Sequence, residues 1–117
     1  MDDVWGWNFV SKNNDPTDDV GHGTHVAGTI AATTNNSLGV AGISPKSKIM
    51  IVKGLGPFGG STSDLVQAIY YATYNGADVF NNSWGGMGIS STLADAVYYA
   101  QNAGVAVVAA AGNSNEP

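Results

Sequence analysis

Apolar runs alternate with amphipathic stretches along this chain, and this pattern predicts an α/β fold. The apolar runs predict three strands, at residues 48–52, 78–83 and 105–111. Within the first and third strands, residues 49–52 and 105–111 are apolar throughout, which is typical of strands buried on both faces of a sheet. Residues 11–21 are rich in Asn, Asp and Gly and predict a loop.

The amphipathic stretches predict three helices. The first covers residues 22–33 and is rich in small residues that allow close packing. A second helix is expected to begin after a capping Ser61 or Ser63 and to end at Gly76. The third is expected to begin after Ser90 or Ser91 and to end at Gly104.

Helices and strands therefore alternate, with short turns and no hairpin signal between them. This order favours a single parallel sheet with right-handed crossovers, covered by helices in a three-layer arrangement. In such sheets ligands bind beyond the carboxyl ends of the strands. Those ends are expected at residues 54–56, 83–86 and 112–113.

Composition narrows the class of protein. The chain has 117 residues, of which 44% are hydrophobic and 11% charged, and this fits one compact domain or a part of one. With a net charge of −5, the chain lacks the excess of basic residues that binding to nucleic acid requires. The absence of cysteine excludes disulfides and thiolate chemistry. The longest apolar stretch, 104–111, is too short to span a bilayer, and Met1-Asp2-Asp3 is not a signal-peptide start. The early aromatic residues and the ending Glu116-Pro117 suggest an excerpt of a longer domain.

His22 is the first candidate for chemistry. It stands at the predicted junction of loop and helix, between two glycines that leave room for a substrate chain. From position alone, such a histidine serves either as a general base or as a structural residue.

Three motifs resemble those of the subtilisin-like serine proteases, the subtilases of peptidase family S8. The run His22-Gly23-Thr24-His25-Val26-Ala27-Gly28 is similar to their histidine signature. Residues 82–86 (Asn-Ser-Trp-Gly-Gly) resemble the segment lining their primary specificity pocket, and 110–113 (Ala-Ala-Gly-Asn) resemble the segment that holds the oxyanion-hole asparagine. The motifs stand in the family's order and span essentially the whole chain.

The resemblance implies that residues 1–117 are the central part of a subtilisin-like catalytic domain, with an incomplete parallel sheet flanked by helices. The parent would be a secreted serine endopeptidase that hydrolyses peptide bonds through an acyl-enzyme. His22 would be its general base, and Asn113 would donate a hydrogen bond to the oxyanion. Without the resemblance, Asn113 reads as a turn former after a strand.

The resemblance also implies a substrate-binding site on two backbone segments that clamp an extended peptide. These segments are Gly59-Gly60-Ser61 and Ser83-Trp84-Gly85. The alternative is that both are ordinary tight connections after strands, with Ser61 as a helix cap. Trp84 adjoins the expected pocket, where it would narrow or cap the pocket or belong to the core.

No cofactor is required for this chemistry, but the resemblance implies a structural calcium ion. Its ligands in this chain would be Thr34, Asn36, Leu38 and Val40, with the remaining ligands upstream of Met1. A second calcium loop of some relatives would fall at 8–17, for which a solvated acidic loop is the alternative. A metal site made by His22 and His25 is disfavoured because HExxH is absent and no third ligand is implied.

Two members of the catalytic triad are missing from the sequence. No Asp-Thr/Ser-Gly motif occurs, and no serine stands in Gly-Thr-Ser-Met-Ala, so the chain alone is expected to be inactive. Because the missing strands would leave sheet edges open, a homo-oligomer is expected.

The rival interpretations are a non-catalytic, self-associating or peptide-binding α/β domain, a nucleotide-binding βαβ domain, and a weak esterase. The nucleotide-binding domain is disfavoured because no GxGxxG or P-loop lysine occurs. The esterase would need a dyad of His22 with Asp18 or Asp19, beside a nearby serine.

Overall fold

The computed structural model describes residues 5–86 and 88–115. Strands and helices alternate along the chain, which confirms the predicted α/β class. The elements are β1 (Trp5–Asn8), α1 (His22–Ala31), β2 (Met50–Lys53), α2 (Thr62–Tyr74), β3 (Val79–Asn82), α3 (Ser91–Asn102) and β4 (Ala106–Ala109). Each predicted helix and strand is present, with ends within a few residues of those expected.

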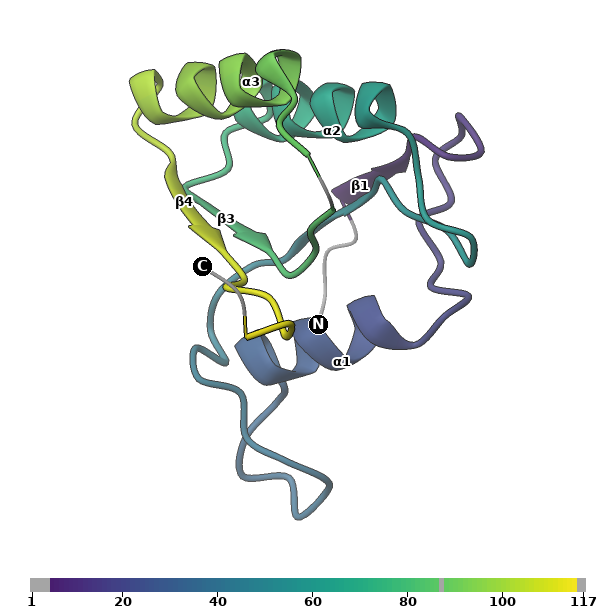
Figure 1. The fold of residues 1–117 in the computed structure, drawn as a ribbon. Coiled ribbons are helices and arrows are strands. Elements are labelled where there is room, and N and C mark those ends of the chain that lie inside the picture. The colour runs from purple at the N-terminus through teal and green to yellow at the C-terminus, as the bar shows by residue number, and fades with distance from the viewer. Residues whose placement is uncertain (1–4, 87, 116–117) are drawn as a thin grey trace.

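The helices lie on both sides of the strands (Figure 1). Helices α2 and α3 pack side by side above the strands, and α1 lies on the opposite side. This is the three-layer arrangement that the sequence predicts. Among the described residues, no helix is both long and apolar enough to cross a membrane.

The strands form two parallel pairs rather than the single sheet expected from the sequence. Strand β1 pairs with β2, and β3 pairs with β4. Within 5–86 and 88–115, no ladder joins β2 to β3, although α2 connects them. The sequence predicts that strands exist, but pairing depends on which backbone lies beside each edge. The incomplete sheet that the family resemblance implies agrees with these two separate pairs.

Strand β1 was not predicted. Its residues Trp5 to Asn8 include a glycine and an asparagine, two residue types that are uncommon in strands, so the pattern gave no strand signal. Gly6 is required by the pairing, because a Cβ there would overlap the carbonyl oxygen of Ile51 on β2.

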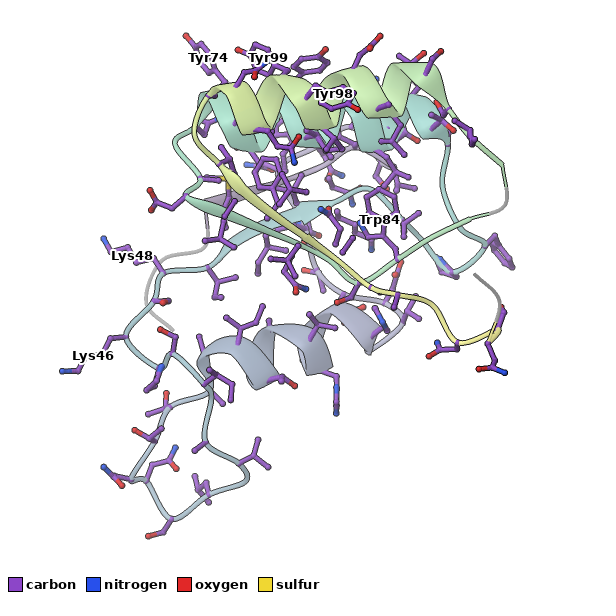
Figure 2. All side chains as sticks on the ribbon, turned by 60° about the vertical axis from the view of Figure 1, so that its left-hand side comes forward. Lys46, Lys48, Tyr74, Trp84, Tyr98 and Tyr99 are labelled. Carbon is purple, nitrogen blue, oxygen red and sulfur yellow. The ribbon has the colours of Figure 1, made fainter. Side chains whose placement is uncertain are left out.

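The core lies between α2, α3 and the strands. Its central residues are Ile69, Ala72, Phe80, Ala96, Ala100 and Val105. Ala96 and Ala100 have no exposed surface, so small side chains let α3 pack closely against its neighbours. On the outer face of the same helices, Tyr74, Tyr98 and Tyr99 point away from the strands (Figure 2), and the rings of Tyr70 and Tyr99 lie 4.9 Å apart.

The apolar sequences of β2 and β4 predicted that both strands would be buried on both faces, and this prediction is wrong. All four residues of β2 are half-buried, and Val108 on β4 is 53% exposed. On β3, Phe80 is buried while its neighbour Val79 is 59% exposed. The β3–β4 ladder is therefore covered on the face toward α2 and α3 and open on the other.

Two of the predicted helix caps are confirmed. The Asp64 amide donates a hydrogen bond to Ser61 Oγ at 3.0 Å, and the Leu93 amide donates to Ser90 Oγ at 3.2 Å. Both bonds satisfy an amide that the first turn of a helix leaves without an intrahelical partner. Ser61 and Ser90, rather than Ser63 and Ser91, are thus the N-caps of α2 and α3.

Candidate active site

His22 is the first residue of α1 and is exposed to solvent. No hydrogen bond or ion pair joins its imidazole to any other residue in the described part of the chain. The Asp18 and Asp19 carboxylates both have other partners: Asp18 binds backbone and threonine donors, and Asp19 pairs with Lys53 at 2.9 Å. The dyad of His22 with Asp18 or Asp19, proposed above as a rival, is therefore absent from this structure.

Near His22, the residue with the most strongly shifted pKa is Asp18. Its carboxylate accepts hydrogen bonds from Thr24, Val20 and Gly21, and these hold the pKa of Asp18 well below its ordinary value of 3.8. The Thr24 side chain is the largest cause, followed by the backbone amides. From the sequence, Asp18 is expected only as an alternative dyad partner of His22, and its hydrogen bonds to the first turn of α1 are not predicted. The only sequence feature that points to these hydrogen bonds is the position of an aspartate three residues before Gly21, the residue that precedes His22.

His25 lies one turn after His22 on α1 and is also exposed. Within 5–86 and 88–115, no group of three or more His, Cys, Asp or Glu side chains could hold a metal ion. Among the described residues, the His22–His25 pair therefore has no third side chain of these types beside it.

The expected substrate segments follow the carboxyl ends of the strands. Gly59 and Gly60 are exposed after β2, while Ser83 and Trp84 are half-buried after β3 and Gly85 is exposed. Figure 2 shows Trp84 in the space between the α2–α3 pair and α1. The Asn81 side-chain amide donates to Ser83 Oγ at 2.9 Å. Each segment follows the carboxyl end of a strand in its own parallel pair, which is where such folds bind ligands.

The segment after β2 owes its shape to close backbone contacts. Gly56 and Gly59 exchange two backbone hydrogen bonds of 2.9 and 3.0 Å, which close a tight turn. A Cβ on Gly60 would overlap the carbonyl oxygen of Gly54, and Gly54 is itself buried against Leu65. The absence of a side chain at residue 54 is thus explained by packing against Leu65.

Asn113 is exposed in the turn after β4. In both views the segment after β4 runs from the strand toward α1, the helix that begins with His22 (Figures 1 and 2). The side chain of Asn113 makes no hydrogen bond to another described residue, so its amide is available as a donor.

The expected calcium loop encloses an open hollow of about 220 Å³, lined by residues 33–41. Asn35, Ser37 and Gly39 all have positive φ, so the backbone between the expected ligands Thr34, Asn36, Leu38 and Val40 curls tightly. These four residues offer only neutral oxygens, and Asn36 Oδ1 already accepts the Leu38 amide at 3.1 Å. Calcium takes six to eight oxygens, so this loop by itself fits only part of a site.

The acidic loop at 8–17 is organised by its own hydrogen bonds. Asn8 is buried, and its side chain binds the Asp15 carbonyl oxygen at 2.9 Å and the Ser11 amide at 2.9 Å. The Asp15 carboxylate accepts bonds from the Thr17 hydroxyl and amide, and these lower the pKa of Asp15. Protein donors thus already engage the carboxylate that a second calcium ion would need.

Known proteins with similar sequences identify the family of the chain. The model of the subtilase family (Peptidase_S8) matches residues 2–117. The chain is 49% identical over 112 residues to a thermophilic serine proteinase of Bacillus sp. (strain AK1). This match covers 95% of this chain and 28% of that protein. It is 47% identical over 112 residues to thermitase of Thermoactinomyces vulgaris, and the match covers 95% of this chain and 40% of thermitase.

A third relative is subtilisin Savinase of Lederbergia lenta, 49% identical over 110 residues, which cover 93% of this chain and 40% of that protein. The chain therefore spans well under half the length of these relatives. Because the family model matches almost every residue and the relatives are so similar, the chain belongs to the subtilase family.

Proposed function

We propose that this chain supplies the general base and an oxyanion donor of a subtilisin-like serine endopeptidase. The observation that carries the proposal is the family match over residues 2–117, which includes His22 at the start of α1 and Asn113 after β4. The parent enzyme is secreted and hydrolyses peptide bonds through an acyl-enzyme.

In this proposal the His22 imidazole takes the proton of a serine hydroxyl supplied by another part of the protease. The serine oxygen bonds to the scissile carbonyl carbon, and the Asn113 amide donates a hydrogen bond to the oxyanion that forms. Protonated His22 then gives its proton to the departing amine, which completes the acyl-enzyme. A water molecule repeats the two proton transfers and releases the acid.

The substrate lies as an extended strand between 59–61 and 83–85. Backbone groups in the two segments pair with the peptide whatever its sequence, and side pockets select alternate side chains. The half-buried indole of Trp84 forms a wall of the pocket for the residue before the cleaved bond. Ser61 serves both this surface and the cap of α2, because its Oγ accepts the Asp64 amide while the residue as a whole stays exposed.

The chain on its own is expected to be inactive, because it contains the base and the oxyanion donor but no serine in the family's nucleophile motif. The test is hydrolysis of an activated peptide ester and a peptide anilide by the purified 117-residue chain. His22→Ala and a serine-directed phosphonate are the controls. The expected rate equals that of His22→Ala. Activity abolished by both controls would show that a serine of this chain completes a site, and the inactivity claim would be wrong.

Calcium is proposed as a structural ligand of the 33–41 loop in the parent enzyme and takes no part in the chemistry. Thr34, Asn36, Leu38 and Val40 would hold it through carbonyl and amide oxygens. Because these groups carry no charge to offset the dehydration of the ion, additional ligands from elsewhere in the protease are needed for tight binding.

A second proposal concerns the chain by itself, as a self-associating α/β domain. The open face of the β3–β4 ladder exposes Val79 and Val108, and β2 and β3 each have one edge unpaired among the described residues. Such edges and apolar faces favour pairing between copies.

Sedimentation velocity between about 1 and 100 μM tests this, since mass action favours the oligomer at higher concentration. The expected result is a dimer or larger species that grows with concentration. Val108→Lys, which places a charge on the open face, is expected to shift the distribution toward monomer. A monomer over the whole concentration range would contradict the proposal, and the activity claims would be unaffected.

A further inference from the structure

The turn before His22 is built around one carboxylate. Asp18 Oδ2 accepts the Thr24 amide at 2.7 Å and the Thr24 hydroxyl at 2.7 Å. Asp18 Oδ1 accepts the amides of Val20 and Gly21, both at 2.9 Å. The carboxylate therefore holds residues on both sides of His22: Gly21 and Val20, one and two positions before it, and Thr24, two positions after it.

Helix α1 lacks the usual cap. Its N-cap is Gly21, with φ of 88°, and it has no side chain to accept a first-turn amide. The first backbone bond within the helix runs from the His25 amide to the Gly21 carbonyl oxygen at 3.1 Å, so the Thr24 amide has no intrahelical acceptor. Asp18 satisfies this amide from three residues before the N-cap, and its negative charge lies at the positive end of the helix dipole.

The same turn is fixed to the strands by Lys53 at the end of β2. The Lys53 ammonium donates to the Thr17 carbonyl oxygen at 2.8 Å and pairs with the Asp19 carboxylate at 2.9 Å. The Lys53 side chain is only 11% exposed, so packing limits its freedom. The two residues flanking Asp18 are therefore held by a strand that is distant in the sequence.

We infer that Asp18 is a positioning residue for His22: its carboxylate clamps the first turn of α1, and Lys53 anchors that clamp to β2. The meaning of this clamp for catalysis rests on the proposed function, whereas the clamp itself does not. Gly23 lies beside the carboxylate: a Cβ there would be 3.7 Å from Asp18 Oδ2, an ordinary van der Waals contact.

Asp18 does not act here as a partner of the His22 ring. Both of its oxygens bind backbone amides or the Thr24 hydroxyl, and neither binds the imidazole. The role is therefore to fix the backbone from which His22 projects, which reduces the rotational freedom of the base before substrate arrives.

Backbone amide hydrogen exchange by NMR, measured near neutral pH on the whole chain, tests the inference. In Asp18→Ala the Thr24 amide is expected to exchange about tenfold faster or more, since a hydrogen bond to a charged acceptor is lost. The heteronuclear NOE of the His22 amide should fall with it. Asp18→Asn keeps one acceptor oxygen, so partial protection should be restored. Signals from α2 and α3 report whether each variant is folded.

Asp19→Asn is the matched control, because it removes the neighbouring carboxylate and its ion pair with Lys53 while leaving all four hydrogen bonds to the Asp18 carboxylate in place. It should leave the Thr24 amide protected. Equal loss of protection in Asp18→Ala and Asp19→Asn, or no loss in Asp18→Ala, would overturn the inference.

A carboxyl-detected titration of the unsubstituted chain provides an independent check. The clamp lowers the pKa of Asp18, so this side chain should still be mostly ionised at pH 3.8, the ordinary midpoint of an aspartate. The clamp therefore stabilises the fold at pH values above 3.8, and this contribution is lost as pH falls through the lowered pKa. Half-protonation of Asp18 at or above pH 3.8 would show that the clamp is not formed. Because these readouts need no substrate, failure of the clamp and failure of the proposed function are distinguishable.

Discussion

Replacing His22 with alanine is expected to lower kcat by about a million-fold in a complete protease that contains this chain, which is the size of the loss known for a subtilisin without its histidine. The protease would be a chimera in which this chain replaces the matching segment of thermitase, a relative that is 47% identical over 112 residues. The loss follows because the serine hydroxyl then has no acceptor for its proton. Steady-state hydrolysis of a peptide anilide measures it.

His25→Ala is the matched control for this experiment, since it removes the same side chain from the same helix one turn later. Asn113→Ala should give an intermediate loss of about 10²–10³-fold, again the size known from a subtilisin. Equal losses for His22→Ala and His25→Ala would mean that damage to α1, rather than loss of the base, accounts for the effect. An active His22→Ala chimera would contradict the proposed role of His22.

Phe80→Ala is expected to destabilise the chain by about 3–5 kcal/mol, because it removes a large aromatic ring from the core. Phe80 is 7% exposed and belongs to the same core cluster as Ile69 on α2 and Ala96 on α3. A loss of this size is comparable to the whole stability of many small domains, so the variant should show no cooperative transition. Urea unfolding followed by circular dichroism measures the change.

The neighbouring residue provides the control. Val79 lies on the same strand but is 59% exposed on the open face, so Val79→Ala should change the free energy of unfolding by less than about 0.5 kcal/mol. If both variants lost the same stability, the assignment of the covered and open faces of the β3–β4 ladder would be wrong.

The sequence predicted most elements because their signals are local. Helix α2 has apolar residues at helical spacing and a serine cap, and the structure uses both. Strand β1 gave no such signal, since it is four residues long and includes Gly6. Its pairing with β2 is decided by contacts between segments far apart in the chain.

Burial and pairing were predicted less well than the elements themselves. The apolar run of β4 indicated burial on both faces, yet Val108 is 53% exposed. Burial is a property of the neighbours of a strand, and the sequence of the strand alone does not contain it.

For the candidate site, the sequence identified His22 and Asn113 through the family resemblance, not through spacing. It did not identify the clamp at Asp18 or its anchor at Lys53. A hydrogen-bonded turn depends on backbone angles such as the positive φ of Gly21, and the anchor joins residues that meet only after β2 has paired. Neither the turn at Asp18 nor its anchor at Lys53 produces a recognisable pattern in the amino-acid sequence.

The arrangement of the strands in two separate pairs also bears on the order of folding. Strands β3 and β4 are joined by α3 alone, so their pairing closes a short loop and forms early. Strands β1 and β2 are separated by the longer segment that contains α1, and their pairing closes a larger loop at greater entropic cost. Because Lys53 reaches the turn before His22 from β2, helix α1 is expected to acquire its final orientation last, after the core around Phe80 has formed.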